Sequence, residues 1–355
     1  MRSPRLLTAA ALLAALLATP SIAAAATPAS YAPPPPYAPV PAPGTGALDG
    51  YEATATDPAG MPPGIVNGPC QPSPSHPYPV VLVHGTFANE NYTWQTLAPM
   101  LSDSGYCVFG LDYGATPGGG SGVYATYYIQ DSAAEIQQFV AGTVLPDTFE
   151  PGGNAAGYVA GSHPAQVDMV GHSQGGMMPR YLIDNTGNAQ YPGLGEASEV
   201  HTLVGLAPSN HGTDLFGLTN LENQLAALFG EPGAVYQDSS FGGSCEACSE
   251  QMAGSPFLQA LNAHPDPSSV QMYVIESDHD EVVTPYTSAF LPEDANAVNT
   301  LLQDQCPKDL TEHLGIVYDP VALADVAAAL ADNGPTAQPL PAPTCPPAVA
   351  PVVSG

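Results

Sequence analysis

Five short apolar runs lie along the middle of the chain, and each ends at a polar or glycine-containing turn. They are Tyr78–Val83, Tyr106–Leu111, Val167–Val170, Val200–Leu206 and Val270–Ile275. Continuous runs of this length are typical of strands that are buried on both faces. The pattern between and after the runs predicts helices near Trp94–Ser102, Gln130–Val144, Gln174–Asn185 and Pro320–Ala331. Together they predict an α/β fold in which helices flank a mostly parallel central sheet.

One long stretch interrupts this alternation. Residues 210–255 have no clear strand, are rich in Gly and Ser, and include the amphipathic segment Leu218–Phe229. Long insertions of this kind lie outside the sheet and often carry function. We therefore predict a lid or cap above the strand ends.

The two ends of the chain differ in composition from the middle. Residues 1–26 combine a short basic start, an apolar stretch too short to span a bilayer comfortably and a run of small residues, which predicts a cleavable signal peptide. An uncleaved anchor is the alternative. Proline is frequent in residues 27–63, which predicts a disordered arm, and again in the tail 335–355. One folded domain is expected over residues 64–334.

Charge and cysteine content narrow the possible environments. The chain has 4 Lys and Arg against 33 Asp and Glu, for a net charge of −29, which argues against nucleic acid and anionic lipid as partners. No later segment is apolar enough to cross a membrane, so we predict no stable membrane insertion. With the predicted signal peptide, this indicates an exported protein. We expect it to be a monomer.

The 6 cysteines of an exported chain predict three disulfides, although six cysteines allow fifteen connectivities. Order along the chain suggests Cys70–Cys107, Cys245–Cys248 and Cys306–Cys345, the last of which would tether the tail. Metal binding is the alternative for the C-x-x-C at Cys245. A lone pair is a weak metal signal, and we predict no metal site.

Reactive chemistry is concentrated at Gly171-His172-Ser173-Gln174-Gly175. This G-x-S-x-G sequence follows an apolar strand and precedes a helix-compatible segment. That context is typical of the nucleophile elbow of α/β-hydrolases, where a sharp turn lifts the serine hydroxyl above the sheet. The alternative is a tight turn that merely contains a serine.

A serine nucleophile needs a base and an orienting acid, which in this fold follow in the order acid, then histidine. His313 is the one histidine that lies beyond an acidic loop after the run Val270–Ile275. His211 is the second choice, but it precedes that loop. For the acid, Asp280 is favoured by the apolar residues after it, and Asp278 stays open.

Stabilisation of an oxyanion requires two backbone N–H groups, one after the nucleophile and one from the loop after an earlier strand. These predict Gln174 and Thr86, the latter in His84-Gly85-Thr86. The Thr86 hydroxyl is a further candidate donor.

The same segments carry a family resemblance. His84-Gly85-Thr86-Phe87, Leu111-Asp112-Tyr113-Gly114, the Ser173 pentapeptide, Asp280-Glu281-Val282-Val283-Thr284-Pro285 and His313-Leu314-Gly315 occur here in the family's order. The chain resembles the secreted bacterial class 2 lipases and esterases and, more distantly, fungal lipase B. The resemblance implies a triad of Ser173, Asp280 and His313, and independently favours Asp280 over Asp278.

A function follows as an expectation. The resemblance implies hydrolysis of carboxylic esters, including acylglycerols, through an acyl-enzyme and without a cofactor. Phe87 and Tyr113 are candidate walls of an acyl pocket. Two alternatives are an exported acyltransferase on the same fold and a secreted surface protein on an inactivated hydrolase scaffold.

Overall fold

The computed structural model describes residues 46–116, 122–148, 166–214, 217, 221, 245–292, 296–332, 334 and 336–345. The predicted signal peptide, residues 27–45 of the predicted arm and residues 346–355 lie outside the described residues. So does most of the predicted insertion at 210–255, including the segment Leu218–Phe229 apart from Leu221.

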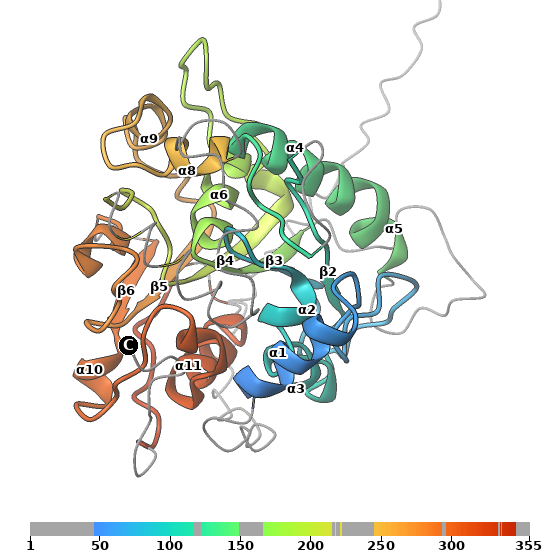
Figure 1. Cartoon of the computed structure of the whole chain (residues 1–355). Helices are drawn as coiled ribbons and strands as arrows, with labels where there is room; N and C mark the ends of the chain where they lie inside the picture. Colours follow the sequence, from blue (N-terminus) through green and yellow to red (C-terminus); the bar gives the residue numbers. More distant parts are fainter. Residues whose placement is uncertain are drawn as a thin grey trace, which may run out of the picture. The chain divides into compact units, whose positions relative to one another are not determined.

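Parallel strands form the centre of the domain. In the described part of the chain, six strands make one sheet in the order β2-β1-β3-β4-β5-β6 (Figure 1). They are β1 Val80–Val83, β2 Val108–Gly110, β3 Val167–His172, β4 Val200–Leu206, β5 Gln271–Glu276 and β6 Ala297–Leu301. Every residue of β1, β2, β3 and β5 is buried, which explains why their sequences are mostly apolar.

Helices cover the sheet. In Figure 1, α4 and α6 lie above it and α3 and α11 below it; α6 packs on β3 and β4, and α11 on β4 and β5. The α-helices are α1 Gly46–Thr56, α2 Glu90–Thr93, α3 Leu97–Asp103, α4 Ile129–Phe139, α5 Leu145–Asp147, α6 Gln174–Ile183, α8 Glu246–Glu250, α9 Pro256–Leu261, α10 Leu302–Gln305 and α11 Pro320–Leu330. A π-helical turn, Val140–Val144, joins α4 to α5. The predicted α/β architecture is confirmed.

Helix α1 departs from the sequence prediction, because it lies within the segment expected to be a disordered arm. No proline occurs between Pro43 and Pro58, so this stretch is free to form backbone hydrogen bonds. Helix α1 packs against α2, and a side chain at Gly50 would meet the carbonyl oxygen of Tyr92 and the hydroxyl of Tyr318. Tertiary packing of α1 therefore orders residues that composition alone assigns to the arm.

Three disulfides have the pairing that chain order suggests. Cys70–Cys107 joins the segment before β1 to the start of β2, Cys245–Cys248 closes the start of α8, and Cys306–Cys345 tethers the tail. None of the described cysteines is free. No helix among the described residues is long and apolar enough to cross a membrane.

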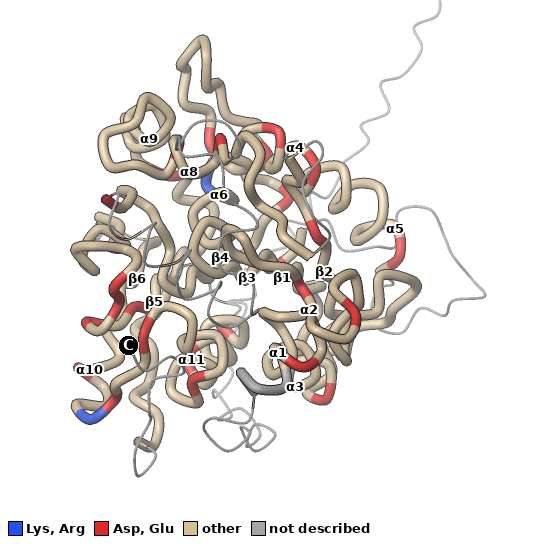
Figure 2. Tube along the Cα trace, viewed as in Figure 1, with Lys and Arg blue, Asp and Glu red and all other residues tan. Residues whose placement is uncertain are grey.

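Acidic residues greatly outnumber basic residues in the described part of the chain. Acidic residues occur on many elements, whereas the described basic residues are Arg180 and Lys308 (Figure 2). Arg180 is buried at 2% exposure, and its Nε and Nη2 donate to Oδ1 and Oδ2 of Asp266 at 2.9 and 3.0 Å. Because this bidentate ion pair neutralises the Arg180 charge inside the domain, acidic residues predominate on the described surface.

Several carboxyl groups lie in the interior of the domain, where basic residues are few; the Asp112 side chain is 16% exposed, and the other four named below are buried. We refer to Glu90, Asp112, Glu250, Asp319 and Asp325 as the buried carboxyl group. Burial raises the pKa of Glu90 to about 8, of Asp112 to about 6, and of Glu250, Asp319 and Asp325 to about 7. Removal from water disfavours the charged carboxylate and so raises the pKa.

Candidate active site

Ser173 occupies a sharp turn between a strand and a helix. Strand β3 ends at His172 and α6 begins at Gln174, while Ser173 itself has φ 54° and ψ −122°. A side chain at Gly171 would overlap the carbonyl oxygen of Gly175, and one at Gly175 would overlap that of Val83. The two glycines are therefore required for the close approach of backbone segments that creates the elbow.

A buried histidine–carboxylate pair lies on the loops that follow β5 and α10. His313 Nδ1 is 2.7 Å from Asp280 Oδ2, and both side chains are fully buried. Asp280 Oδ1 accepts the backbone N–H groups of Val282 and Val283, each at 2.7 Å. These bonds fix the carboxylate, so the ring nitrogen facing it, Nδ1, carries the proton.

The other ring nitrogen of His313 is available for chemistry. Nε2 is buried and has no hydrogen-bond partner among the described residues. Burial lowers the pKa of His313, but the Asp280 charge and hydrogen bond, with Glu281 and Glu312, outweigh burial and raise it above its ordinary value. The arrangement gives a neutral imidazole that accepts a proton at Nε2 and an ion pair once it has done so.

His172 connects the elbow to the His313 loop. Its Nε2–H donates to the backbone carbonyl of His313 at 2.9 Å, and the two rings are 4.7 Å apart between centroids. Burial, together with the charges of His313 and His84, lowers the pKa of His172 well below its ordinary value. His172 therefore stays neutral. Because it directly precedes Ser173, its hydrogen bond holds the backbone of His313 close to the elbow.

The loop after β1 lies directly against the nucleophile. A Cβ on Gly85 would be 3.0 Å from the Ser173 Cβ. The next residue, Thr86, donates its hydroxyl to Gln174 Oε1 at 2.7 Å. Gln174 is the first residue of α6, where backbone N–H groups have no partner within the helix. The two residues predicted to bind an oxyanion are thus brought together, although the Thr86 hydroxyl points to Gln174.

The two candidate pocket residues occupy different environments. Phe87 is buried, has φ 62°, and donates its backbone N–H to the carbonyl of Tyr124 at 3.0 Å. Tyr113 is 1% exposed, and its hydroxyl donates to the carbonyl of His84 at 2.6 Å. Its ring stacks on that of His84 at a centroid distance of 4.5 Å. This geometry makes Tyr113 a support of the loop after β1.

The alternative residues lie elsewhere. Asp278 has a side chain that is 39% exposed, and its carboxylate is 3.5 Å from His279, also exposed. His211 Nδ1 bonds to the carbonyl of Ser288 at 3.1 Å. Neither makes a contact like the one between Asp280 and His313. In the described part of the chain, no three or more His, Cys, Asp or Glu side chains are grouped so as to hold a metal ion.

Gln251 also belongs to this site, although no sequence motif indicates it. Its amide Nε2 donates to Thr86 Oγ1 at 2.8 Å and to Gln174 Oε1 at 3.1 Å. Its Oε1 accepts the hydroxyl of Ser209 at 2.9 Å. The one available signal was a polar residue just after Cys245-x-x-Cys248, which does not indicate a position beside Ser173.

Comparison with known structures identifies the fold as that of the α/β-hydrolases. Lipase B from Aspergillus fumigatus is similar with a TM-score of 0.51 and 19% identity over 78% of this chain and 56% of that one. The chain thus spans little more than half the length of that lipase. Esterase B from Lactobacillus rhamnosis (TM-score 0.44, 16% identity, 77% and 86% covered) and lipase BlEst2 from Bacillus licheniformis (0.42, 16%, 70% and 89%) are similar at lower scores.

The family comparison is more specific. Residues 159–323 match the model of the class 2 lipases, and the match includes Ser173, Asp280 and His313. The resemblance indicated by the motifs is confirmed over this segment. Comparison with curated proteins gives no match.

Proposed function

We propose that this protein is an exported carboxylester hydrolase that acts through an acyl-enzyme on Ser173. The observation that carries the proposal is the buried His313–Asp280 pair, 2.7 Å apart, whose free Nε2 belongs to a loop bonded to the elbow of Ser173. A nucleophile, a base and an orienting acid are the groups that acyl transfer requires.

The first half-reaction forms the acyl-enzyme. His313 Nε2 takes the Ser173 proton as Oγ attacks the ester carbonyl, and the C–O π electrons move to the oxygen. The backbone N–H groups of Thr86 and Gln174 stabilise this oxyanion; removing one such donor typically slows an enzyme about 10²- to 10³-fold. The tetrahedral intermediate then collapses, and His313 gives its proton to the departing alkoxide.

The second half-reaction releases the acid. His313 Nε2 takes a proton from water, whose oxygen attacks the acyl carbon, and the Ser173 oxygen leaves with the proton that His313 returns. Asp280 keeps its hydrogen bond to His313 Nδ1 and stabilises the imidazolium in each half-reaction. Burial of the pair strengthens this stabilisation, because little water screens the two charges.

The substrate class proposed is an uncharged ester of a lipid or similar acyl compound. The class 2 lipase match supports it, and so does the large excess of Asp and Glu over Lys and Arg, which disfavours anionic substrates. Phe87 remains a candidate wall of the acyl pocket. Export is supported by the three disulfides, which persist in oxidising compartments.

The test is hydrolysis of p-nitrophenyl esters, from acetate to palmitate, by the wild type, Ser173→Ala and the control Ser75→Ala at an exposed serine. We expect the wild type and the control to cleave at least one ester and Ser173→Ala to be inactive. Equal activity of all three proteins would show that Ser173 is not the nucleophile. Added alcohol tests acyl transfer, because an acyltransferase yields the new ester in preference to the acid.

A further inference from the structure

A closed hydrogen-bond network joins the side chains of the proposed oxyanion hole. Thr86 donates to Gln174 Oε1 at 2.7 Å, and Gln251 Nε2 donates to both, at 2.8 and 3.1 Å. Gln251 is 2% exposed. Each side of this triangle is a hydrogen bond, so the position of any one side chain constrains the other two.

The triangle fixes backbones that come from different parts of the fold. Thr86 follows β1, whereas Gln174 begins α6, and no covalent link shorter than 88 residues joins them. Both N–H groups must point to the same oxygen for the oxyanion to be stabilised. A side-chain link between the two residues sets the separation of those N–H groups before substrate arrives.

Gln251 is itself held firmly in place. Its N–H donates to the carbonyl of Ala247, and its own carbonyl accepts the N–H of Thr213, at 2.9 and 3.0 Å. Its Oε1 accepts the Ser209 hydroxyl at 2.9 Å, so neither end of the amide is free to turn. The Cys245–Cys248 disulfide closes the helix that leads to Gln251.

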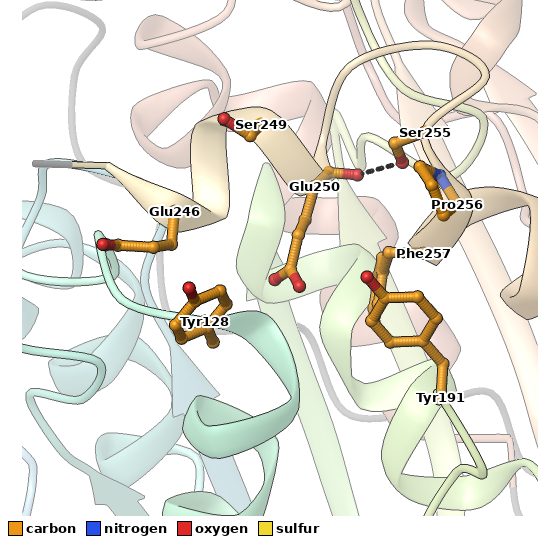
Figure 3. A pocket seen from close by; sticks show the side chains of 8 residues that line it. All are labelled: Tyr128, Tyr191, Glu246, Ser249, Glu250, Ser255, Pro256 and Phe257. Carbon is orange, nitrogen blue, oxygen red and sulfur yellow. Dashed lines mark hydrogen bonds between the residues drawn. The ribbon is translucent and has the colours of Figure 1, made fainter. Parts of the chain in front are cut away.

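The preceding residue, Glu250, anchors the same segment. Figure 3 shows its side chain pointing into a pocket between Tyr128 and the rings of Tyr191 and Phe257, while its carbonyl oxygen accepts the Ser255 hydroxyl at 2.6 Å. Its carboxylate accepts the backbone N–H of Ile129, at the start of α4, at 2.7 Å. Glu250 thus ties α8 to the rest of the domain, and Gln251 extends from that anchored end.

We infer that Gln251 is a positioning residue that aligns the oxyanion-binding N–H groups of Thr86 and Gln174; the inference rests on the proposed function. Supports of this kind around a reactive group commonly change its performance 10- to 100-fold when removed, by analogy with the groups that orient metal ligands. Because the oxyanion forms as the transition state is reached, we expect loss of Gln251 to lower turnover and to leave KM nearly unchanged.

The experiment compares Gln251→Met, which keeps the volume but has no hydrogen bonds, with Gln251→Glu, which keeps the shape but replaces the amide donor. Gln259→Ala is the matched control, a glutamine exposed on α9. Two rates are measured: turnover of the best p-nitrophenyl ester, and covalent reaction of Ser173 with a p-nitrophenyl alkylphosphonate. Active sites are counted from the phosphonate reaction at completion, so loss of folded protein is separated from loss of rate.

We expect both Gln251 variants to lose about 10- to 100-fold in kcat and to slow in the phosphonate reaction to a similar extent, with KM within about twofold and the control unchanged. Wild-type rates per active site in both variants would overturn the inference and leave the proposed function intact. A wild type that reacts with the phosphonate but cleaves no ester would refute the proposed function, and the phosphonate rates alone would then decide the role of Gln251. A wild type that reacts with neither refutes both.

Discussion

Replacing Asp280 by asparagine tests the proposed triad at its most fully described contact. The wild-type carboxylate accepts three N–H groups: His313 Nδ1 on Oδ2, and the backbones of Val282 and Val283 on Oδ1, each at 2.7 Å. An asparagine has one oxygen and one NH₂ group in the same space. In one orientation the NH₂ group faces His313, and in the other it faces two backbone donors.

Either orientation has a cost. With NH₂ toward His313, the ring must turn its lone pair to Nδ1, which places the proton on Nε2 and removes the base. With NH₂ toward the backbone, two buried N–H groups lose their acceptor. Loss of the correct tautomer in a serine triad lowers kcat by about 10⁴, which is roughly 5 kcal/mol of transition-state stabilisation.

The assay is kcat on a p-nitrophenyl ester, with thermal unfolding measured on the same samples. Asp278→Asn is the control. The Asp278 side chain is 39% exposed, and its carboxylate lies 3.5 Å from the exposed His279. We expect Asp280→Asn to lose about 10⁴ in kcat and Asp278→Asn to stay within about twofold of the wild type. The reverse order, or a loss below tenfold in a folded Asp280→Asn protein, would refute the assignment of the acid.

The other predictions concern pH and the disulfides. Since Asp280 raises the pKa of His313, the acid limb of kcat/KM should lie above the ordinary histidine value of 6.5, and an acid limb below it would contradict this prediction. Stability should change in the opposite sense to activity. The buried carboxyl group and His313 all have raised folded-state pKa values, so the stability that they contribute is present at low pH and lost as pH rises through those values. We expect Tm to rise as the pH falls from about 8 to about 5, and a Tm that falls over this interval would contradict the sign. Replacing Cys70 and Cys107 by serine opens a loop with a separation of 37 residues and should cost about 4 kcal/mol in urea unfolding, against about 2 kcal/mol for the 3-residue separation of Cys245 and Cys248. A larger loss for the short loop would show that chain entropy does not set the difference.

Much of the sheet could be predicted from sequence because its strands are buried on both faces. Val200–Leu206 has the predicted bounds, and the other four predicted strands differ only at their ends. Strand β6 was missed, since it is at the edge of the sheet and includes Asn299 and Thr300. An edge strand with polar positions lacks the continuous apolar run on which the prediction depended.

The site divides in the same way. Ser173, Asp280 and His313 follow from the order of motifs, because strand ends and the loops after them have fixed places in this fold. Gln251 could not be predicted, since its hydrogen bonds to Thr86 and Gln174 depend on where the end of α8 lies in the folded domain. Helix α1 is a similar case. Its packing against α2 is a tertiary contact, which amino-acid composition does not indicate.

The most direct test of the central claim is identification of the acylated residue. The wild type is mixed with a p-nitrophenyl ester, quenched in acid within the burst of p-nitrophenol release, digested and analysed by mass spectrometry. We expect the mass of one acyl group on the peptide that contains Ser173, and no such adduct in Ser173→Ala. An acyl group on a different residue, or turnover with no covalent adduct at any time in the burst, would contradict it.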